Sequence, residues 1–181
     1  MRALGVAGLA APTPTPKPHR PSSGAAAYHP AMHHATTAPD AANTLSPAVH
    51  EFLAATRFAT IATVDPDGAP RQAVLWYRLD GDEIVLNSRV GRLWPSNLVR
   101  DARIGVTVVD ADDGYRWVGL TGTVQPITDQ TIAQADIAEM ARRYHADDPA
   151  EAERLIANEF QRQPRISFRV RIAAVHDHLD D

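Results

Sequence analysis

Apolar and polar residues follow short, regular periods from residue 46 onwards, and these patterns predict a chain of strands interrupted by helices. Six segments have strand character, through alternation or through their content of Val, Ile and Thr. We predict strands at 58–64, 71–79, 83–87, 103–109, 115–124 and 165–172. Turns rich in Asp and Gly follow the first, second and fourth of these, which favours antiparallel hairpins.

Four further segments have helical character. The first begins after Ser46, a favourable N-cap, with Pro47 in its first turn. A short helix is predicted at 95–100, and two helices precede the last strand, the second beginning at Asp148. The sequence has no βαβ pattern and no glycine-rich dinucleotide motif. We therefore expect a mainly β protein: a six-stranded antiparallel barrel with peripheral helices.

The first 45 residues have a different composition. They contain half of the 14 prolines, and Ala, Thr, Ser and His fill most of the rest. Large apolar side chains are few, so this segment cannot bury enough surface to offset its chain entropy. We expect a disordered Pro/Ala-rich tail at 1–45 and one folded domain at 46–181.

Composition also narrows the chemistry. Cysteine is absent, which excludes disulfides, thiolate metal sites and a cysteine nucleophile. Lys17 is the only lysine, so the folded domain has none for a Schiff base or a phosphate-binding P-loop. The net charge of -4 argues against a nucleic-acid binder. No apolar run approaches the roughly 18 residues of a membrane span, and we expect a cytoplasmic protein with no membrane partner.

The segment 87–98 is the most unusual in the domain, because Arg89 and Arg92 both flank the predicted start of a helix. A helix N-terminus carries partial positive charge, so arginines there are mildly unfavourable. A bound anion would relieve the conflict, since backbone N–H groups, both guanidiniums and the Ser88 hydroxyl could hold a phosphate. The other interpretation is two solvated surface arginines, and the sequence leaves both open.

Aromatic residues form a second candidate feature. Trp76, Tyr77, Tyr115 and Trp117 could stack on a planar ring, or could pack in the core or at a subunit interface. The arginines of the last strand, at 165, 169 and 171, are most simply explained as a solvent face paired with carboxylates. No residue stands out as an acid, a base or a nucleophile. Such a pattern is typical of proteins whose cofactor carries its own reactivity.

Several short motifs occur in the order found in a known superfamily. They are Phe58-Ala59-Thr60-Ile61-Ala62-Thr63, Asp67-Gly68-Ala69-Pro70, Val74-Leu75-Trp76-Tyr77, Gly91-Arg92, residues 97–103, residues 110–114 and Gly122-Thr123-Val124. On these motifs, residues 46–175 resemble the split β-barrel flavin and deazaflavin proteins, the superfamily named after pyridoxamine 5'-phosphate oxidase. The similarity is closest to the branch that uses coenzyme F420.

The resemblance implies a six-stranded split barrel that forms a homodimer with cofactor sites at its interface. It also implies hydride transfer between the cofactor and a small conjugated substrate. The flavin or deazaflavin ring would lie along the second and third strands, near Trp117, and the phosphate against the loop 87–94 with Arg92 as its main partner. The implied cofactor-binding residues are Gln72, Ala73, Val74, Trp76, Asn87, Ser88, Arg89, Arg92, Leu93, Trp94, Asn97 and Trp117.

One part of the sequence departs from the family pattern. Members often carry a lysine two residues after the arginine that matches Arg92, and another basic residue before the asparagine, where this chain has Trp94 and Ser96. The phosphate would then be held by arginine, hydroxyl and backbone groups. Three functions are compatible with the resemblance: an F420-dependent oxidoreductase, which we expect first, an FMN-dependent oxidase or reductase, and a non-catalytic carrier of flavin, haem or tetrapyrrole.

Overall fold

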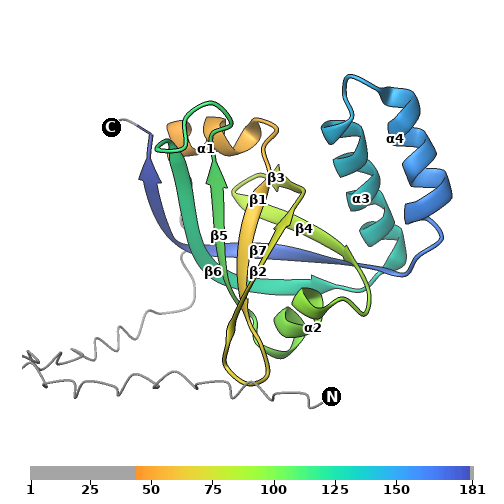
Figure 1. The fold of residues 1–181 in the computed structure, drawn as a ribbon, viewed down its shortest axis with the longest axis horizontal. Helices are drawn as coiled ribbons and strands as arrows, with labels where there is room; N and C mark the ends of the chain where they lie inside the picture. The colour runs from red at the N-terminus through yellow and green to blue at the C-terminus, as the bar shows by residue number, and fades with distance from the viewer. Residues whose placement is uncertain (1–43, 180–181) are drawn as a thin grey trace, which may run out of the picture. The chain divides into compact units, whose positions relative to one another are not determined.

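The structure is a computed structural model that describes residues 44–179, so the tail predicted at 1–45 lies outside the described residues except for its last two positions. The elements follow the predicted order of helix, meander, short helix, hairpin, helices and last strand (Figure 1). They are α1 (Pro47–Ala54), β1 (Ala59–Val64), β2 (Pro70–Leu75), β3 (Tyr77–Asp80), β4 (Glu83–Arg89), α2 (Leu93–Arg100), β5 (Arg103–Val109), β6 (Trp117–Ile127), α3 (Gln130–Tyr144), α4 (Pro149–Leu155), the π-helix η1 (Ile156–Phe160) and β7 (Arg165–His178).

All of these strands belong to one antiparallel sheet, in the order β2-β1-β5-β6-β7-β4-β3. β2 and β3 are consecutive in the chain, yet they form the two opposite edges of the sheet. Leu75 pairs with Ala59 of β1, whereas Tyr77 pairs with Leu86 of β4. Because only Trp76 separates the two strands, the sheet curls until its edges approach each other (Figure 1).

This curled sheet confirms the prediction of a mainly β fold with peripheral helices and corrects the count of strands. The single strand predicted at 71–79 is two strands, so the sheet has seven strands and not six. The physical reason is a change of hydrogen-bonding partner at Trp76, from β1 to β4. Residue alternation continues across this point, and therefore the sequence pattern does not reveal the break.

The main apolar core fills the inside of the curled sheet. Every second residue of β7 from Ile166 to Ile172 enters this core, as its alternation predicted. Helix α1 covers one end with the stripe Val49, Phe52 and Leu53, and α2 lies at the other end (Figure 1). The Ser46 hydroxyl accepts a hydrogen bond from the Val49 backbone N–H at 3.3 Å, which confirms the predicted N-cap.

Helix α3 packs on the outside of the sheet against β4 and β7, with α4 and η1 alongside it (Figure 1). This layer overturns the prediction that the arginines of the last strand form a solvent face. Arg165 is only 6% exposed, and Arg169 reaches the α3 residue Asp136 at 3.3 Å. Only Arg171 of the three is exposed. Among residues 44–179, no helix is both long and apolar enough to cross a membrane.

Candidate functional site

Three arginines come together where β4, β7 and the start of α2 meet. Arg89, the last residue of β4, lies opposite Arg165, the first residue of β7, in the antiparallel register. Gly91 has a φ of 87°, a conformation that glycine adopts readily, and the turn places Arg92 at the N-cap of α2. Arg89 and Arg92 are exposed, and within the described part of the chain neither forms an ion pair. We call these three residues the arginine cluster.

Arg165 is the buried member of the arginine cluster. Its Nε and Nη2 atoms donate hydrogen bonds to Oδ1 of Asn87, at 2.9 and 2.7 Å. Its guanidinium also lies 5.1 Å from the centroid of the Phe160 ring, within the range of a cation–π contact. Burial, followed by the charges of Arg92 and Arg89, lowers the pKa of Arg165 to about 10. The guanidinium remains charged at neutral pH, so the site has a concentrated positive charge.

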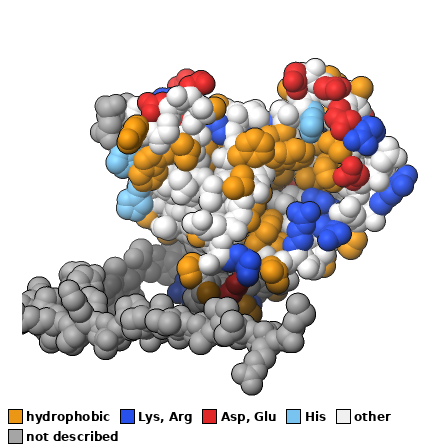
Figure 2. Space-filling model, viewed as in Figure 1, with side chains coloured by type: hydrophobic (Ala, Val, Ile, Leu, Met, Phe, Trp, Pro, Cys, Tyr) orange, Lys and Arg blue, Asp and Glu red, His pale blue; other side chains and the backbone are white. Residues whose placement is uncertain are grey.

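A cavity of about 330 Å³ lies beside the arginine cluster. Figure 2 shows arginine side chains next to an apolar area on this face of the domain. The volume falls near the lower end of small-molecule sites, which span roughly 300–1,000 Å³. The cavity is lined by Phe58, Val74, Leu75, Trp76, Asn87, Arg92, Ile137, Met140, Glu159, Phe160, Gln163 and Arg165. One wall is therefore polar and cationic, and the other is apolar and partly aromatic.

Trp76 connects the break between β2 and β3 to this cavity. Its ring stacks on Tyr144 of α3, with 4.9 Å between centroids and 13° between planes, and it meets Phe160 edge-on at 6.3 Å. The Tyr144 hydroxyl accepts a hydrogen bond from the Tyr77 backbone N–H at 3.1 Å and donates one to the carbonyl of Arg57. One face of the Trp76 ring is thus covered by the protein itself, which holds this wall of the cavity in place.

Four of the predicted cofactor-binding residues line the cavity together: Val74, Trp76, Asn87 and Arg92. Arg89 lies next to them through its pairing with Arg165. The structure therefore brings together predicted residues from two separate segments of the chain, 74–76 and 87–92.

Other predicted residues on the same loop have different surroundings. Ser88 is 1% exposed and, by strand alternation, lies on the core side of β4, away from Asn87. The Trp94 ring packs in the core, while Leu93 is 63% exposed. Nδ2 of Asn97 donates to Oδ1 of Asp65 at 2.6 Å and so ties α2 to the end of β1.

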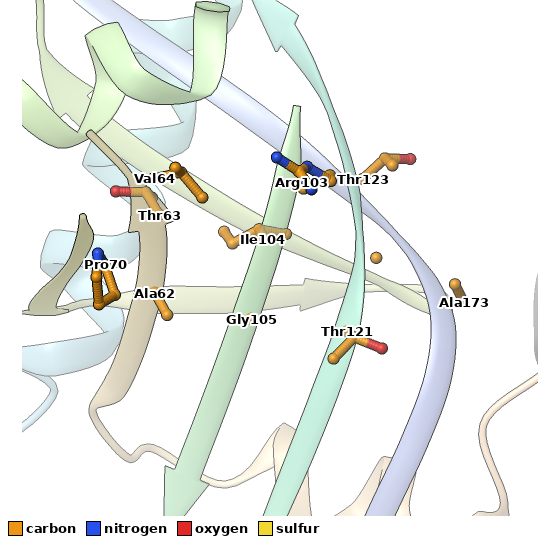
Figure 3. A pocket seen from close by; sticks show the side chains of 11 residues that line it. Ala62, Thr63, Val64, Pro70, Arg103, Ile104, Gly105, Thr121, Thr123 and Ala173 are labelled. Atoms are coloured by element: carbon orange, nitrogen blue, oxygen red, sulfur yellow. The ribbon is translucent and has the colours of Figure 1, made fainter. Parts of the chain in front are cut away.

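Gln72 and Trp117 lie on another surface, the outer face of β1, β5 and β6, where both line a cavity of about 230 Å³. Trp117 stacks on His178, with 4.3 Å between ring centroids. An apolar hollow of about 490 Å³ continues along the same face and is lined largely by small side chains (Figure 3). Ala73, also predicted, instead packs against the core.

Sequence reasoning missed Arg165, Phe160 and Gln163, which also line the first cavity. Arg165 was grouped with solvent-facing residues because it alternates with core positions. A signal was present, since Ser167 shares its face and a helix with an apolar stripe at Ile137 and Met140 precedes the strand. The apolar stripe of that helix must pack against another element, and the helix packs on the face of β7 that carries Arg165 and Ser167.

Residues 45–179 match the family described as pyridoxamine 5'-phosphate oxidase, and this match spans more than half of the chain. The chain belongs to the pyridoxamine 5'-phosphate oxidase family. The resemblance found in the sequence is thereby confirmed. No curated protein matches the chain.

Solved structures share the fold of the pyridoxamine 5'-phosphate oxidase family at low sequence identity. An F420 reductase has a TM-score of 0.57 and 23% identity, over 71% of this chain and 96% of that chain. A conserved hypothetical protein from Mycobacterium tuberculosis has a TM-score of 0.61 and 22% identity, over 77% of this chain and 88% of that chain. The heme storage protein HutZ from Vibrio cholerae has a TM-score of 0.57 and 16% identity, over 75% of this chain and 95% of that chain. At these identities the similarity establishes the fold and does not select a cofactor.

Proposed function

We propose that this protein is an oxidoreductase that transfers a hydride between a deazaflavin or flavin cofactor and a small conjugated substrate. F420 is the leading cofactor, and FMN is the alternative. The observation that carries the proposal is the cavity in which Arg92 and Arg165 face an apolar wall. Both cofactors combine a planar ring with an anionic phosphate group, which matches that division. Family membership and the fold shared with an F420 reductase support the same function.

The residues of the cavity fit the anionic part of such a cofactor. Within residues 44–179, Arg92 and Arg165 have no carboxylate at ion-pair distance, so their charges are available to a phosphate. Glu159 also lines the cavity and contributes one negative charge to its wall. Val74 and Phe58, which both line the cavity, are 69% and 59% exposed, so they offer apolar surface that a bound ring could cover.

In this proposal the chain binds and orients, and the bound cofactor supplies the hydride chemistry. Arg92 and Arg165 would fix the phosphate end. Val74, Phe58 and Met140 would exclude water from one side of the ring. No side chain is assigned as a proton donor, and the site contains no group of three or more His, Asp or Glu residues, among those described, that could hold a metal ion.

We also propose that the protein works as a cytoplasmic homodimer. The cavity is small for a cofactor with a long side chain, so part of the ligand would extend beyond it. The outer face of β1, β5 and β6 could supply the second subunit's surface, because Ala62, Gly105 and Thr121 leave it shallow and low in charge (Figure 3).

The experiment that tests the proposed function is an absorbance and mass analysis of the ligand that copurifies with the full chain, followed by titration with F420. Micromolar or tighter binding of reduced F420 is expected. Replacing Arg92 by Ala should weaken cofactor binding by about 1.5–3 kcal/mol, because it removes a charge-assisted hydrogen bond. Arg162→Ala is the matched control, since Arg162 is exposed and, within residues 44–179, its guanidinium forms a hydrogen bond only with Asn158. Tight FMN copurification without F420 binding would reject F420 and leave the FMN enzyme.

A non-catalytic haem or tetrapyrrole carrier is the second candidate function. His176 lines the cavity on the outer face of β6 and β7 together with Trp117, and an imidazole is a common axial ligand of haem. Two proteins of similar structure are the heme storage protein HutZ from Vibrio cholerae and a heme binding protein from Mycobacterium smegmatis. A haem titration with a His176→Ala variant tests this candidate. Haem binding lost in the variant, together with no turnover of F420 or FMN, would favour the carrier.

A further inference from the structure

We propose that Arg165, more than Arg92, is the primary binding residue for the anionic group of a phosphate ester in the cavity, and that Asn87 positions its guanidinium. Arg92 is then a secondary partner at the rim. This inference deepens the proposed function, on which it rests for the identity of the ligand. It concerns a residue that the loop motif 87–98 does not contain.

Hydrogen-bond accounting leaves Arg165 with donors to spare. A guanidinium has five N–H donors. Nε and one Nη2 hydrogen are used on Oδ1 of Asn87, at 2.9 and 2.7 Å. Within residues 44–179 no acceptor lies at hydrogen-bond distance from Nη1. Because Arg165 lines the cavity, these remaining donors are available to a ligand there.

A comparison of the ion pairs of the poorly exposed arginines also favours Arg165 as the anion-binding residue. Two other poorly exposed arginines of the domain are paired: Arg57 lies 2.8 Å from a carboxylate oxygen of Asp110, and Arg78 lies 2.7 Å from one of Asp136. Arg165 is more buried than either, and in the described chain it has no carboxylate within 4.0 Å. Its charged neighbours in the arginine cluster carry the same sign. A buried, unpaired cation is costly, and an anion in the cavity would remove that cost.

Arg165 is also more rigidly held than Arg92. Its backbone N–H donates to Oε1 of Gln130 at 2.9 Å, and its carbonyl accepts from Nε2 of the same side chain at 2.9 Å. Arg92 is exposed and would lose rotamer freedom on binding, whereas the Arg165 side chain is already ordered. An ordered donor loses less entropy on binding, which favours Arg165 as the stronger partner.

Asn87 is the positioning residue for this guanidinium. Its Nδ2 donates to the carbonyl of Ala133 in α3 at 2.8 Å and to Oγ of Ser167 in β7 at 2.9 Å. These two bonds orient the amide so that Oδ1 faces Arg165. Asn87 therefore accepts only part of the hydrogen bonds that Arg165 can donate and, as a neutral amide, does not neutralise its charge.

The test uses the full chain freed of bound cofactor, with inorganic phosphate as the probe. Thermal unfolding is measured in phosphate and in chloride at equal ionic strength, for the wild type, Arg165→Gln, Arg92→Gln and the control Arg162→Gln. Phosphate should raise the Tm of the wild type and of Arg162→Gln, raise that of Arg92→Gln less, and leave that of Arg165→Gln unchanged. A phosphate effect that survives in Arg165→Gln, or that is absent from the wild type, overturns the proposal.

A second measurement compares FMN with riboflavin, which differ by the phosphate group. The wild-type preference for FMN should fall by at least about tenfold in both variants, and further in Arg165→Gln than in Arg92→Gln. An equal preference in Arg165→Gln and the wild type would reject Arg165 while leaving the flavin function intact. If neither FMN nor F420 binds but phosphate protection still depends on Arg165, the proposed function fails and the anion site stands.

Asn87→Asp keeps the test decisive if Arg165→Gln does not fold. The new carboxylate would pair with Arg165 and neutralise the charge that the anion needs, while retaining an acceptor for Nε and Nη2. The folded variant should therefore lose the phosphate-dependent rise in Tm. A folded Asn87→Asp protein with the full wild-type rise would overturn the proposal.

Discussion

Oδ1 of Asn87 accepts two hydrogen bonds from the Arg165 guanidinium, although the two residues are 78 positions apart in the chain. The Nδ2 of the same amide donates to Ala133 of α3 and to Ser167 of β7. One buried side chain therefore connects β4, β7 and the outer helix layer. It also sets the orientation of the most buried charge in the candidate site.

Replacing Asn87 by Ala should destabilise the fold by about 2–4 kcal/mol, because the Arg165 guanidinium loses its acceptor and the Ala133 carbonyl and Ser167 hydroxyl lose their donor. Urea unfolding of the full chain measures the free energy. Asn158→Ala is the control, since Asn158 is exposed and lies on η1, and it should change stability by less than about 0.5 kcal/mol. Equal stabilities of the two variants would contradict a connecting role for Asn87.

Gly122→Ala should be severely destabilising. The pairing of β6 with β7 shifts register between Thr121 and Gly122, and a Cβ on Gly122 would lie 2.1 Å from the carbonyl oxygen of Arg171. Backbone cannot yield as a flexible side chain does, so we expect a loss of about 2–4 kcal/mol or a failure to fold. Gly114→Ala is the matched control, since a Cβ there meets nothing within 4 Å. A well-folded Gly122→Ala protein with wild-type stability would disprove this packing.

Tyr144→Phe should cost about 1–2 kcal/mol of stability. The hydroxyl accepts from the Tyr77 backbone N–H and donates to the Arg57 carbonyl, so its removal leaves two backbone groups without a partner. The aromatic ring, and its stacking on Trp76, would remain. Tyr115→Phe removes a hydroxyl from a residue that is 90% exposed and should have no measurable effect on the denaturation midpoint.

Acidification should weaken the junction between β1 and α2. Hydrogen bonds from Arg71 and Asn97 lower the pKa of Asp65 from 3.8 to about 2. A carboxyl whose pKa is lower in the folded state stabilises the fold above its unfolded pKa, and this contribution is lost as the pH falls from about 4 to 2. Asp65→Asn should therefore be less stable than the wild type at pH 6, with the difference shrinking toward pH 2. The exposed Asp112→Asn variant should keep the wild-type pH profile, and an identical profile for Asp65→Asn would refute the assignment.

Thr121→Arg should dissociate the proposed homodimer. Thr121 is exposed and lies between both cavities on the outer face of β6, so a long charged side chain there would hold a second subunit away. Sedimentation velocity of the full chain measures the oligomeric state. Thr131→Arg, on the exposed first turn of α3, is the control and should leave the state unchanged. If Thr121→Arg remains dimeric, the interface lies elsewhere.

Local patterns predicted most of the fold because they reflect neighbours in the chain. The N-cap at Ser46 and the alternation from Ile166 to Ile172 were both correct. The break at Trp76 was missed because it depends on which strands flank the chain, and that information comes from residues far away in the sequence. Register between distant strands is a tertiary property that alternation alone does not fix.

The candidate site divides in the same way. The loop from Asn87 to Arg92 was predicted as a site from the sequence, since arginines at a helix start conflict with the helix dipole. Arg165 was missed because its burial depends on α3, which covers one face of β7. Ser88 was grouped with the loop by proximity in the chain, whereas strand alternation turns its side chain to the core.

A single residue, Trp76, connects β2 and β3, the two edge strands of the curled sheet. The two edge strands are not neighbours in the sheet, and they are joined by the backbone of Trp76, whose side chain is also a wall of the cavity. Local unfolding of either edge strand would move Trp76, and a ligand bound against the indole would oppose that movement in both strands. Ligand binding in the cavity should therefore slow amide hydrogen exchange in both β2 and β3, although these two strands form no hydrogen bonds with each other.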